Sequence, residues 1–203
     1  VDLLLPVARD YPAAARLNLV VSEALQALGR DTESIELLRT CLTAGRWQDA
    51  TVLRELFVSL WRLKRYDEID QLLRLAQHQP GLKNHFVVEH AAAIFYSALK
   101  TTAAERKRSE RRAKWLDRQA LKHARKAAAL VALAGRSADV ESLATLFMEL
   151  GRPADAVSLL AAARELDVPH SPEAGILEAT ALCELDRADD AGLLLDGLLD
   201  DPE

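Results

Sequence analysis

The sequence has few of the residues that build β-rich or tightly turned domains. Its 203 residues include only eight glycines, two asparagines and ten aromatic side chains. The tight turns of an all-β fold depend on Gly and Asn, so their scarcity argues against that class. Half of the residues are apolar and few of those are aromatic, so the core has to consist mainly of Leu, Ala and Val. This mixture favours helices.

Cysteine and long apolar runs are also scarce. Cys41 and Cys183 lie far apart on apolar helical patterns, and their spacing fits neither a disulfide framework nor a zinc site. We therefore expect two buried, inert thiols. No apolar run is long enough to span a bilayer. The compartment stays open, with the reducing cytoplasm favoured, and a membrane partner is disfavoured.

The segment 137–169 carries two amphipathic helical patterns on either side of Gly151 and Pro153. Gly151 is expected to end the first helix in the left-handed conformation, and Pro153 suits the first turn of the next. A hairpin this short cannot bury its own apolar faces, so it needs similar hairpins as neighbours. The expected core residues are Val140, Leu143, Ala144, Phe147 and Leu150 in the first helix and Ala156, Leu159, Leu160, Ala163 and Leu166 in the second.

The turn positions set a period for the whole chain. Gly29 and Lys64 are 35 residues apart, and so are Gly151 and Asp186. A fixed period in this range indicates an all-α array of helical hairpins. We predict one solenoid domain of about five hairpins, a piece of a longer array. Its segments are 1–12 (the second helix of a truncated repeat), 13–46, 47–81, 82–135, 136–170 and 171–203.

The two terminal segments follow the same helical pattern. We expect Leu4 and Val7 to face the core in segment 1–12. In the last repeat, the first helix is expected to bury a face made of Ile176, Ala179, Leu182 and Cys183.

These features resemble the tetratricopeptide repeat (TPR) family, whose unit is a helical hairpin of about 34 residues. The family's turn glycine corresponds to Gly29, Lys64, Gly151 and Asp186, its small residue to Ser34, Ile69, Ala156 and Ala191, and its closing proline to Pro12, Pro80, Pro169 and Pro202. The repeats are degenerate, because the first-helix aromatic signature is mostly absent. The resemblance covers nearly the whole chain and implies a right-handed α-solenoid.

The third repeat is longer than the others. Lys64 and Gly151 are 87 residues apart, which exceeds two periods, and we place the insertion at residues 101–115. Residues 102–105 have the capping-box pattern, and nothing from there to Gly135 breaks a helix. We therefore predict one extended basic helix near 103–134, about 32 residues long.

Charge is divided unevenly along the chain. Residues 100–126 hold eleven cationic and three acidic side chains, a net charge of +8, whereas residues 137–203 carry a net charge of −13. Six cations recur at helical spacing and form what we call the basic stripe. They are Lys107, Arg111, Lys114, Arg118, Lys122 and Arg125.

Three interpretations of the basic stripe stay open. It could be a solvated face that keeps a long helix soluble. It could dock an acidic protein, including the acidic C-terminal repeats of a second copy, so that the chain self-associates. It could instead bind nucleic acid or an anionic membrane. The acidic overall charge and the lack of interleaved aromatic residues disfavour nucleic acid.

Motifs for catalysis and metal binding are sparse. The segment from Ser97 to Lys100 matches the SxxK motif of serine acyl-enzymes, but the companion motifs are missing. His85 and Glu89 are four residues apart, yet no further metal ligand is evident, so helix capping and surface polarity explain them better. We predict no enzyme activity, no cofactor and no metal site.

The TPR resemblance implies a partner-binding concave surface made by the first helix of each hairpin. The register gives Arg16, Glu23, Gln26, Arg54, Trp61, Arg62, His90, Ser97, Glu141, Thr145 and Glu149. Trp61 lies between two arginines, the composition of a binding hot spot, unless it packs against the next hairpin. The Lys and Asn pattern with which some members clamp a C-terminal carboxylate is not reproduced. Leu19 and Val58 occupy two of its places.

These patterns favour a non-catalytic scaffold for protein–protein interaction that binds a peptide or protein segment, with the basic helix as a second contact. One alternative is a sensor or regulatory TPR segment of a multidomain protein, which binds an effector or inhibits an attached domain. Another is an assembly platform in bacterial envelope polymer export. The richness in Ala, Leu and Arg suggests a bacterial source.

Overall fold

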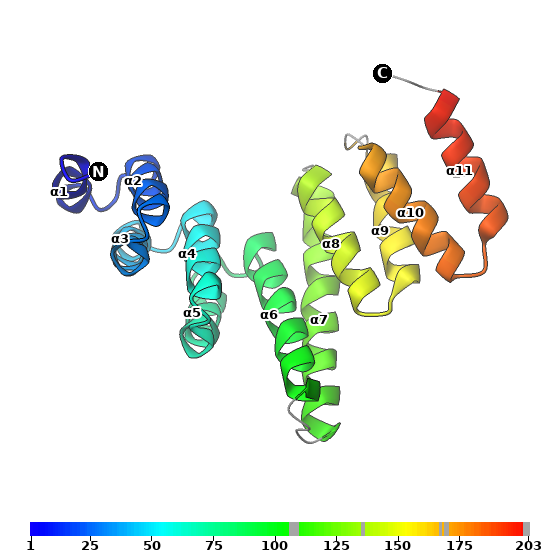
Figure 1. Cartoon of the computed structure of the whole chain (residues 1–203), viewed down its shortest axis with the longest axis horizontal. Coiled ribbons are helices and arrows are strands. Elements are labelled where there is room, and N and C mark those ends of the chain that lie inside the picture. The colour runs from blue at the N-terminus through cyan, green and yellow to red at the C-terminus, as the bar shows by residue number, and fades with distance from the viewer. Residues whose placement is uncertain (106–109, 135–136, 167, 169–170, 201–203) are drawn as a thin grey trace. The chain divides into compact units, whose positions relative to one another are not determined.

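The computed structural model describes residues 1–105, 110–134, 137–166, 168 and 171–200, where α-helices alternate with short turns (Figure 1). The chain divides into two compact units, residues 1–91 and 92–203. The first unit holds α1 (Leu4–Asp10), α2 (Ala15–Ala27), α3 (Asp31–Ala44), α4 (Ala50–Arg62), α5 (Tyr66–His78) and the start of α6 (Phe86–Glu105). The second holds the rest of α6, α7 (Glu110–Ala134), α8 (Ser137–Glu149), α9 (Pro153–Glu165), α10 (Pro172–Glu184) and α11 (Ala188–Asp200).

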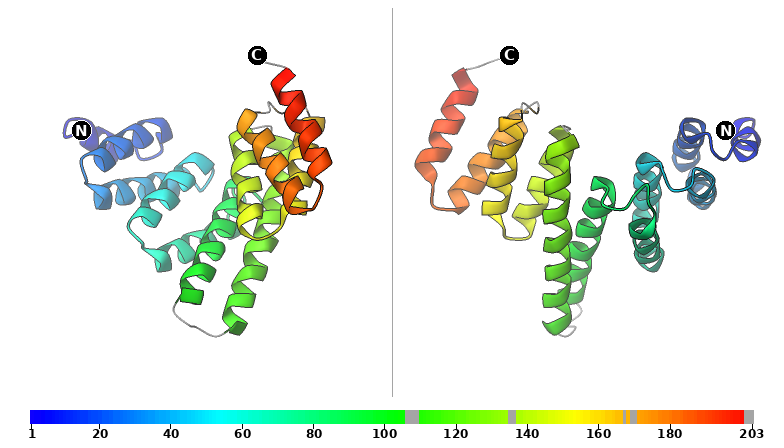
Figure 2. Two further views of the ribbon diagram at one scale, coloured as in Figure 1. Left: turned by 45° about the vertical axis from the view of Figure 1, so that its right-hand side comes forward. Right: turned by 180° about the vertical axis from the view of Figure 1, so that it is seen from behind.

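Consecutive helices pack side by side within each unit. In the first unit α2 packs on α3 and α4 packs on α5, and in the second α8 packs on α9 and α10 on α11. Each of these pairs is also in contact with the next one, through α3 and α4 or through α9 and α10 (Figures 1 and 2). The all-α hairpin architecture expected from the period is therefore present.

The four predicted turn residues share one backbone geometry. Gly29, Lys64, Gly151 and Asp186 have φ values of 72°, 56°, 66° and 57°. At Gly151 the N–H donates to the Met148 carbonyl at 2.9 Å, and the next N–H, of Arg152, donates to the Phe147 carbonyl at 2.8 Å. This is the Schellman pattern, and the other three turns repeat it. The left-handed stop expected at Gly151 is confirmed.

The predicted core of the central hairpin is largely confirmed. Eight of its residues are buried, namely Val140, Leu143, Ala144, Phe147, Ala156, Leu159, Leu160 and Ala163. The prediction for Leu166 was wrong. It lies just beyond the end of α9, where the chain leaves the helix, and its side chain is 56% exposed.

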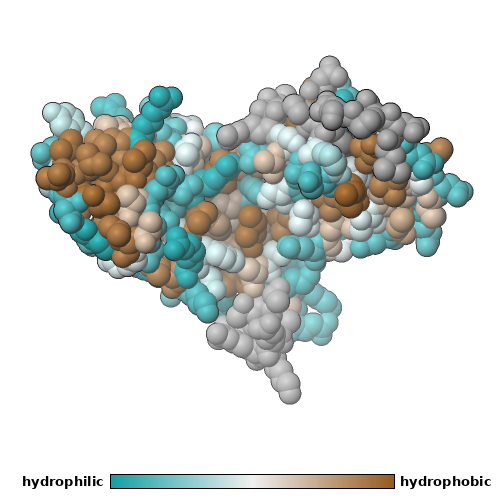
Figure 3. All heavy atoms as spheres, turned by 45° about the horizontal axis from the view of Figure 1, so that its top comes forward, coloured by the Kyte–Doolittle hydropathy of each residue, from teal (hydrophilic) through white to brown (hydrophobic). Residues whose placement is uncertain are grey.

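The buried face of α1 is shifted by one residue along the sequence from the predicted face. Leu5 and Ala8 are buried in a cluster with Val21 and Leu25 of α2, whereas Leu4 and Val7 are exposed. A shift of one residue on a helix turns a side chain by about 100°, which carries Leu4 and Val7 away from α2. Figure 3 shows apolar surface over the N-terminal helices, in brown at the left.

α10 corrects two further expectations. Ile176 and Cys183 are exposed, whereas Ala179 and Leu182 are buried as predicted, on the face that packs on α9 and α11. Gly175 allows the close approach to α11, since a Cβ there would lie 2.3 Å from Leu198 Cδ1. Cys41, in contrast, is buried as expected.

The extended basic helix is present, but it starts later than predicted. Residues 103–105 form the end of α6, and the basic helix is α7, which has 25 residues from Glu110 to Ala134. The insertion thus lengthens both helices of the third hairpin, and residues 106–109 lie outside the described part of the chain. The buried face of α7 starts at Leu116, because Trp115 is 47% exposed.

Candidate functional site

Most of the predicted partner-binding residues of the first unit lie on α2 and α4, and we predict that they share one surface. We call this surface the α2–α4 face, and its members are Arg16, Val20, Glu23, Arg54, Val58, Trp61 and Arg62. Spacings of three and four put the α2 members on one side of that helix and the α4 members on one side of theirs. Val20 and Val58 remain 58% and 40% exposed, so the surface carries apolar as well as charged groups.

Gln26 joins the two helices beneath this face. Its Nε2 donates to the hydroxyls of Ser22, Ser34 and Ser59 at 3.3, 3.2 and 3.0 Å, and all three serines are buried. Its Oε1 accepts a hydrogen bond of 2.8 Å from Arg62 Nη1. Gln26 therefore links α2, α3 and α4, and it holds the Arg62 guanidinium at the edge of the α2–α4 face.

Trp61 packs within its own hairpin. Its ring stacks on Phe57 at 5.7 Å and meets the ring of Tyr66 of α5 edge-on, also at 5.7 Å. The indole is half-buried and fixed by these contacts. Its remaining surface lies one helical turn from the exposed Val58 and adjacent to Arg62, so it can contribute to binding without a rearrangement.

The histidines at the start of α6 have local structural roles. His85 Nδ1 accepts a hydrogen bond from the Val87 N–H at 3.2 Å, so His85 caps the helix, as the capping interpretation predicted. Burial, assisted by the charge of Arg54, lowers the pKa of His85 below 6.5. His90 stacks on Phe86 with ring centroids 5.1 Å apart. Among the described residues, no three His, Cys, Asp or Glu side chains gather as they would around a metal ion.

Four predicted partner-binding residues belong to the second unit. Glu141 accepts hydrogen bonds from the hydroxyls of Ser137 at 2.7 Å and Ser171 at 2.8 Å, so it ties α8 to the N-terminus of α10. Thr145 is exposed and donates to the Glu141 carbonyl at 2.9 Å. Glu149 is exposed on α8, and Ser97 is half-buried on α6. The prediction that both sets form one binding surface stays a prediction.

The basic stripe has two parts, apart from Lys107, which lies outside the described residues. At its C-terminal end, Arg125 forms a bidentate ion pair with Asp155 of α9, at 3.2 and 3.0 Å. The hydrogen bonds to Asp155 raise the pKa of Arg125. Here the basic and acidic regions meet within one chain. The remaining cations, Arg111, Lys114, Arg118 and Lys122, are exposed on α7, and Lys114 pairs with Glu110 at 2.6 Å.

The SxxK lysine serves as a link between helices. Lys100 Nζ of α6 donates to Asp117 Oδ1 of α7 at 2.5 Å, so its ammonium group is engaged in an ion pair. Tyr96, in the same helix, stacks on the buried His123 and meets Trp115 edge-on, at centroid distances of 5.6 and 5.8 Å. These contacts hold the two long helices of the third hairpin together.

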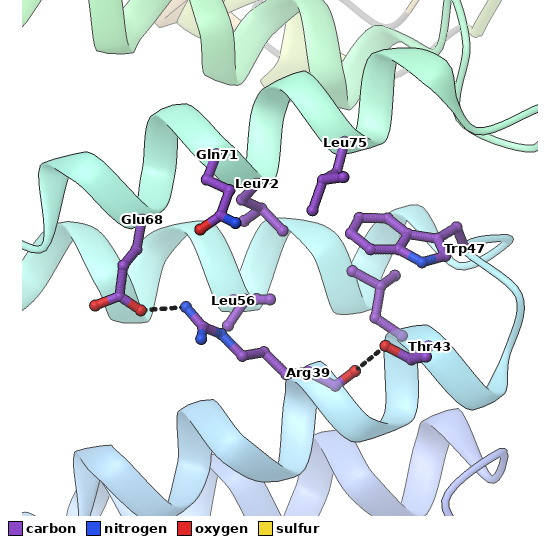
Figure 4. Close-up of a pocket in the computed structure, with 9 residues that line it drawn as sticks. Arg39, Thr43, Trp47, Leu56, Glu68, Gln71, Leu72 and Leu75 are labelled. Carbon is purple, nitrogen blue, oxygen red and sulfur yellow. Dashed lines mark hydrogen bonds and ion pairs between the residues drawn. The ribbon is translucent and has the colours of Figure 1, made fainter.

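A groove of about 200 Å³ lies between α3, α4 and α5 (Figure 4). Leu56 and Leu72 are buried in its wall, and Trp47 and Leu75 stand beside each other at one end. An ion pair between Arg39 and Glu68 crosses the other end. The volume is below the usual range for small-molecule sites, about 300–1,000 Å³, and suits a single apolar side chain. Sequence reasoning missed this groove, since its walls come from three helices.

The sequence contains a second signal of the hairpin turns, besides the glycines. An arginine follows each of the four turn residues, and an acidic residue comes three positions later, as in Arg30–Glu33, Arg65–Glu68 and Arg187–Asp190. Each of these three pairs forms an ion pair at the start of the second helix. In the fourth, Asp155 pairs with Arg125 instead. This Arg-x-x-acid element would have marked the hairpin turns independently of glycine.

No protein-family model and no curated protein matches the chain. Solved structures do resemble it. TTC0263, a thermophilic TPR protein from Thermus thermophilus, is 20% identical with a TM-score of 0.60, over 92% of this chain and 91% of that one. A MamA double mutant (RS-1 ArsTM) is 15% identical with a TM-score of 0.55, over 92% and 93%. MamA MSR-1 C2 is 15% identical with a TM-score of 0.52, over 91% and 94%. These likenesses confirm the predicted TPR-like helical-repeat fold.

Among the described residues, none of the helices combines the length and the apolarity that a membrane span needs.

Proposed function

We propose that this chain is a non-catalytic protein-interaction module that binds an acidic peptide segment on the α2–α4 face. The observation that carries the proposal is the combination of exposed apolar and cationic groups there. Val20 and Val58 are exposed, and Trp61, one helical turn from Val58, is half-buried. Protein interfaces are enriched in Trp and Arg, and such anchors supply most of the binding energy.

The charges of the face define the partner's chemistry. The face carries three arginines, Arg16, Arg54 and Arg62, and one acid, Glu23, and Arg62 also forms an ion pair with Asp31 of α3 at 3.8 Å. A segment that carries acidic side chains around one apolar residue would match both the charge and the apolar groups. Because Gln26 and Arg62 fix α2 against α4, the surface is preformed and the partner alone has to become ordered.

The experiment is a selection of displayed random peptides on the full chain, followed by a binding measurement on the enriched sequences. We expect acidic peptides with an apolar anchor, and we expect the double variant R16E/V58E to bind them at least about tenfold more weakly, since one lost anchor is worth about 1–2 kcal/mol. Both side chains are exposed, so folding should be unchanged. The control K64E/K83E lowers the net charge by a similar amount at exposed positions of the first unit.

Two results would contradict the proposal. Either no peptide is enriched, or the enriched peptides bind R16E/V58E as tightly as the unmodified chain. Circular dichroism of the variant separates loss of binding from loss of fold.

The basic stripe on α7 is proposed as a second contact, for an acidic protein surface. Its exposed cations lie in the second unit, so this contact can be tested separately from the α2–α4 face.

A further inference from the structure

α7 carries an exposed indole within its row of cations. Arg111, Trp115, Arg118 and Lys122 follow one another at spacings of four, three and four, and therefore lie on one side of the helix. We call this row the Trp115 stripe. All four side chains are exposed, and Trp115 is 47% exposed although its ring is held edge-on by Tyr96 at 5.8 Å. In the described part of the chain, no ion pair engages the three cations of this stripe.

α11 carries a row of the same spacing and the opposite charge. Asp189, Leu193 and Asp196 are separated by four and three residues, and all three are exposed. We call this row the Leu193 stripe. Leu193 is 73% exposed, which makes it one of the most exposed large apolar side chains of the described residues. Gly192 and Gly197 lie beside it, and a Cβ at either would meet no atom within 4 Å, so the surface around Leu193 is open.

The two stripes match each other in spacing, charge and apolar content. Each places an apolar side chain between two like charges at positions i, i+4 and i+7, with arginines around Trp115 and aspartates around Leu193. An indole seated on Leu193 would bring the flanking cations and carboxylates together, in a contact that is steered by charge and fixed by apolar burial. The ion pair between Arg125 and Asp155 shows that one cation of this basic helix already pairs with an acidic side chain of α9 within the chain.

One chain cannot join its own two stripes. In the second unit α7 packs on α8 and α9, and α11 packs on α10, so α8 to α10 lie between the two helices (Figure 1). We propose that the Trp115 stripe of one copy docks on the Leu193 stripe of a second copy. This inference rests on the proposed second contact, the basic stripe on α7, and identifies its partner as a second copy of the chain. The interface joins two different surfaces, so it propagates head to tail and gives chains or rings larger than a dimer.

The measurement is the mass of the full chain in solution by light scattering, as a function of concentration and salt. We expect the mass to grow beyond a dimer at low salt, and the association to weaken at least about tenfold in 0.5 M NaCl, because salt screens exposed charges. A chain that stays monomeric at low salt up to about 0.1 mM, a concentration at which weak interfaces are populated, would overturn the proposal.

Two charge-reversal variants give the decisive test. R111E/R118E has two acidic stripes, and D189R/D196R has two basic ones, so neither should associate alone. An equimolar mixture should associate again, because each variant keeps the stripe that the other lost. Controls with the same changes in net charge, K64E/K83E and D10R/E36R, lie at exposed positions of the first unit and should associate like the unmodified chain. Association of either single variant, or no recovery in the mixture, would overturn the proposal.

These outcomes are independent of the peptide-binding experiment. R111E/R118E should still bind the peptides selected on the α2–α4 face. Loss of self-association with retained peptide binding supports the inference, and retained self-association with lost peptide binding overturns it.

Discussion

At the scale of single residues, the protonation of His85 is coupled to folding. Its Nδ1 accepts a hydrogen bond from Val87 at the start of α6, and burial lowers its pKa from 6.5. The folded state therefore binds fewer protons than the unfolded state at pH values between the lowered pKa and 6.5. Stability is fully present above pH 6.5 and is lost as the pH falls through that window.

This gives a prediction for the melting temperature. Between pH 7.5 and 5.5 the unmodified chain should lose more stability than His85→Asn, because Asn can cap the helix but does not titrate. His78→Asn is the matched control, since His78 is an exposed histidine in the last turn of α5. Parallel pH profiles of the unmodified chain and His85→Asn would contradict the prediction.

Residue-level reasoning named five of the seven members of the α2–α4 face, but neither Val20 and Val58 nor the connections between the helices. Arg16, Glu23, Trp61 and Arg62 followed from register alone. The role of Gln26 did not, because it depends on Ser34 of α3 and Ser59 of α4, which only the packing brings within reach. For the same reason Glu141, predicted to bind a partner, is in part a structural link to Ser171.

At the scale of elements, the turns were predictable because their geometry is local. A left-handed residue after a helix is encoded by the residue itself and its neighbours, so Gly29 and Gly151 marked their turns directly. The division between α6 and α7 was not predictable in this way. The residues of the insertion are mostly Ala, Glu, Lys and Arg, which favour a helix throughout. Contacts between the two helices, such as Lys100 with Asp117, belong to the tertiary fold.

The turns also give a prediction about stability. Lys64 has a φ of 56°, a conformation that costs a non-glycine residue about 1–2 kcal/mol, whereas Gly adopts it freely. Lys64→Gly should raise the free energy of unfolding by about 0.5–1 kcal/mol after the greater flexibility of Gly in the unfolded chain is included. Gly151→Lys should lower it by a similar amount.

Chemical denaturation measures both changes. Lys83→Gly is the matched control, because Lys83 lies in an exposed turn without positive φ, so glycine there should only destabilise. If Lys64→Gly destabilised the chain as much as Lys83→Gly, the left-handed conformation would not be the source of the cost.

At the scale of the whole molecule, the separation of a basic region (100–126) from an acidic region (137–203) has two consequences that the net charge does not show. Part of the basic region is neutralised inside the chain, since Arg125 of α7 pairs with Asp155 and Lys100 of α6 pairs with Asp117. The Trp115 stripe is exposed, and we propose that the Leu193 stripe of α11 in a second copy is its complement. The sequence predicted the division of charge, but only the packing of α7 against α9 separates the engaged cations from the exposed ones.

The two cysteines allow the opening of the first unit to be measured by thiol labelling. Cys41 of α3 is buried between α2 and α4, and burial raises the pKa of its thiol, so we expect no reaction until the first unit opens. Cys183 of α10 is exposed and should react at once. A thiol reagent should therefore modify one group per chain in buffer and two in denaturant, and Cys183→Ser should leave no fast group.

In the Cys183→Ser chain, the labelling of Cys41 reports the opening of the first unit alone. Trp47 and Trp61 lie in the same unit, so in a Trp115→Phe background their fluorescence reports the same event. Because α3 is covered on two sides, fraying of one helix does not expose Cys41, and its labelling should follow the fluorescence change through the same denaturant midpoint. Rapid labelling while the fluorescence is still that of the folded chain would mean that α2 or α4 opens independently, and that the unit does not unfold as one body.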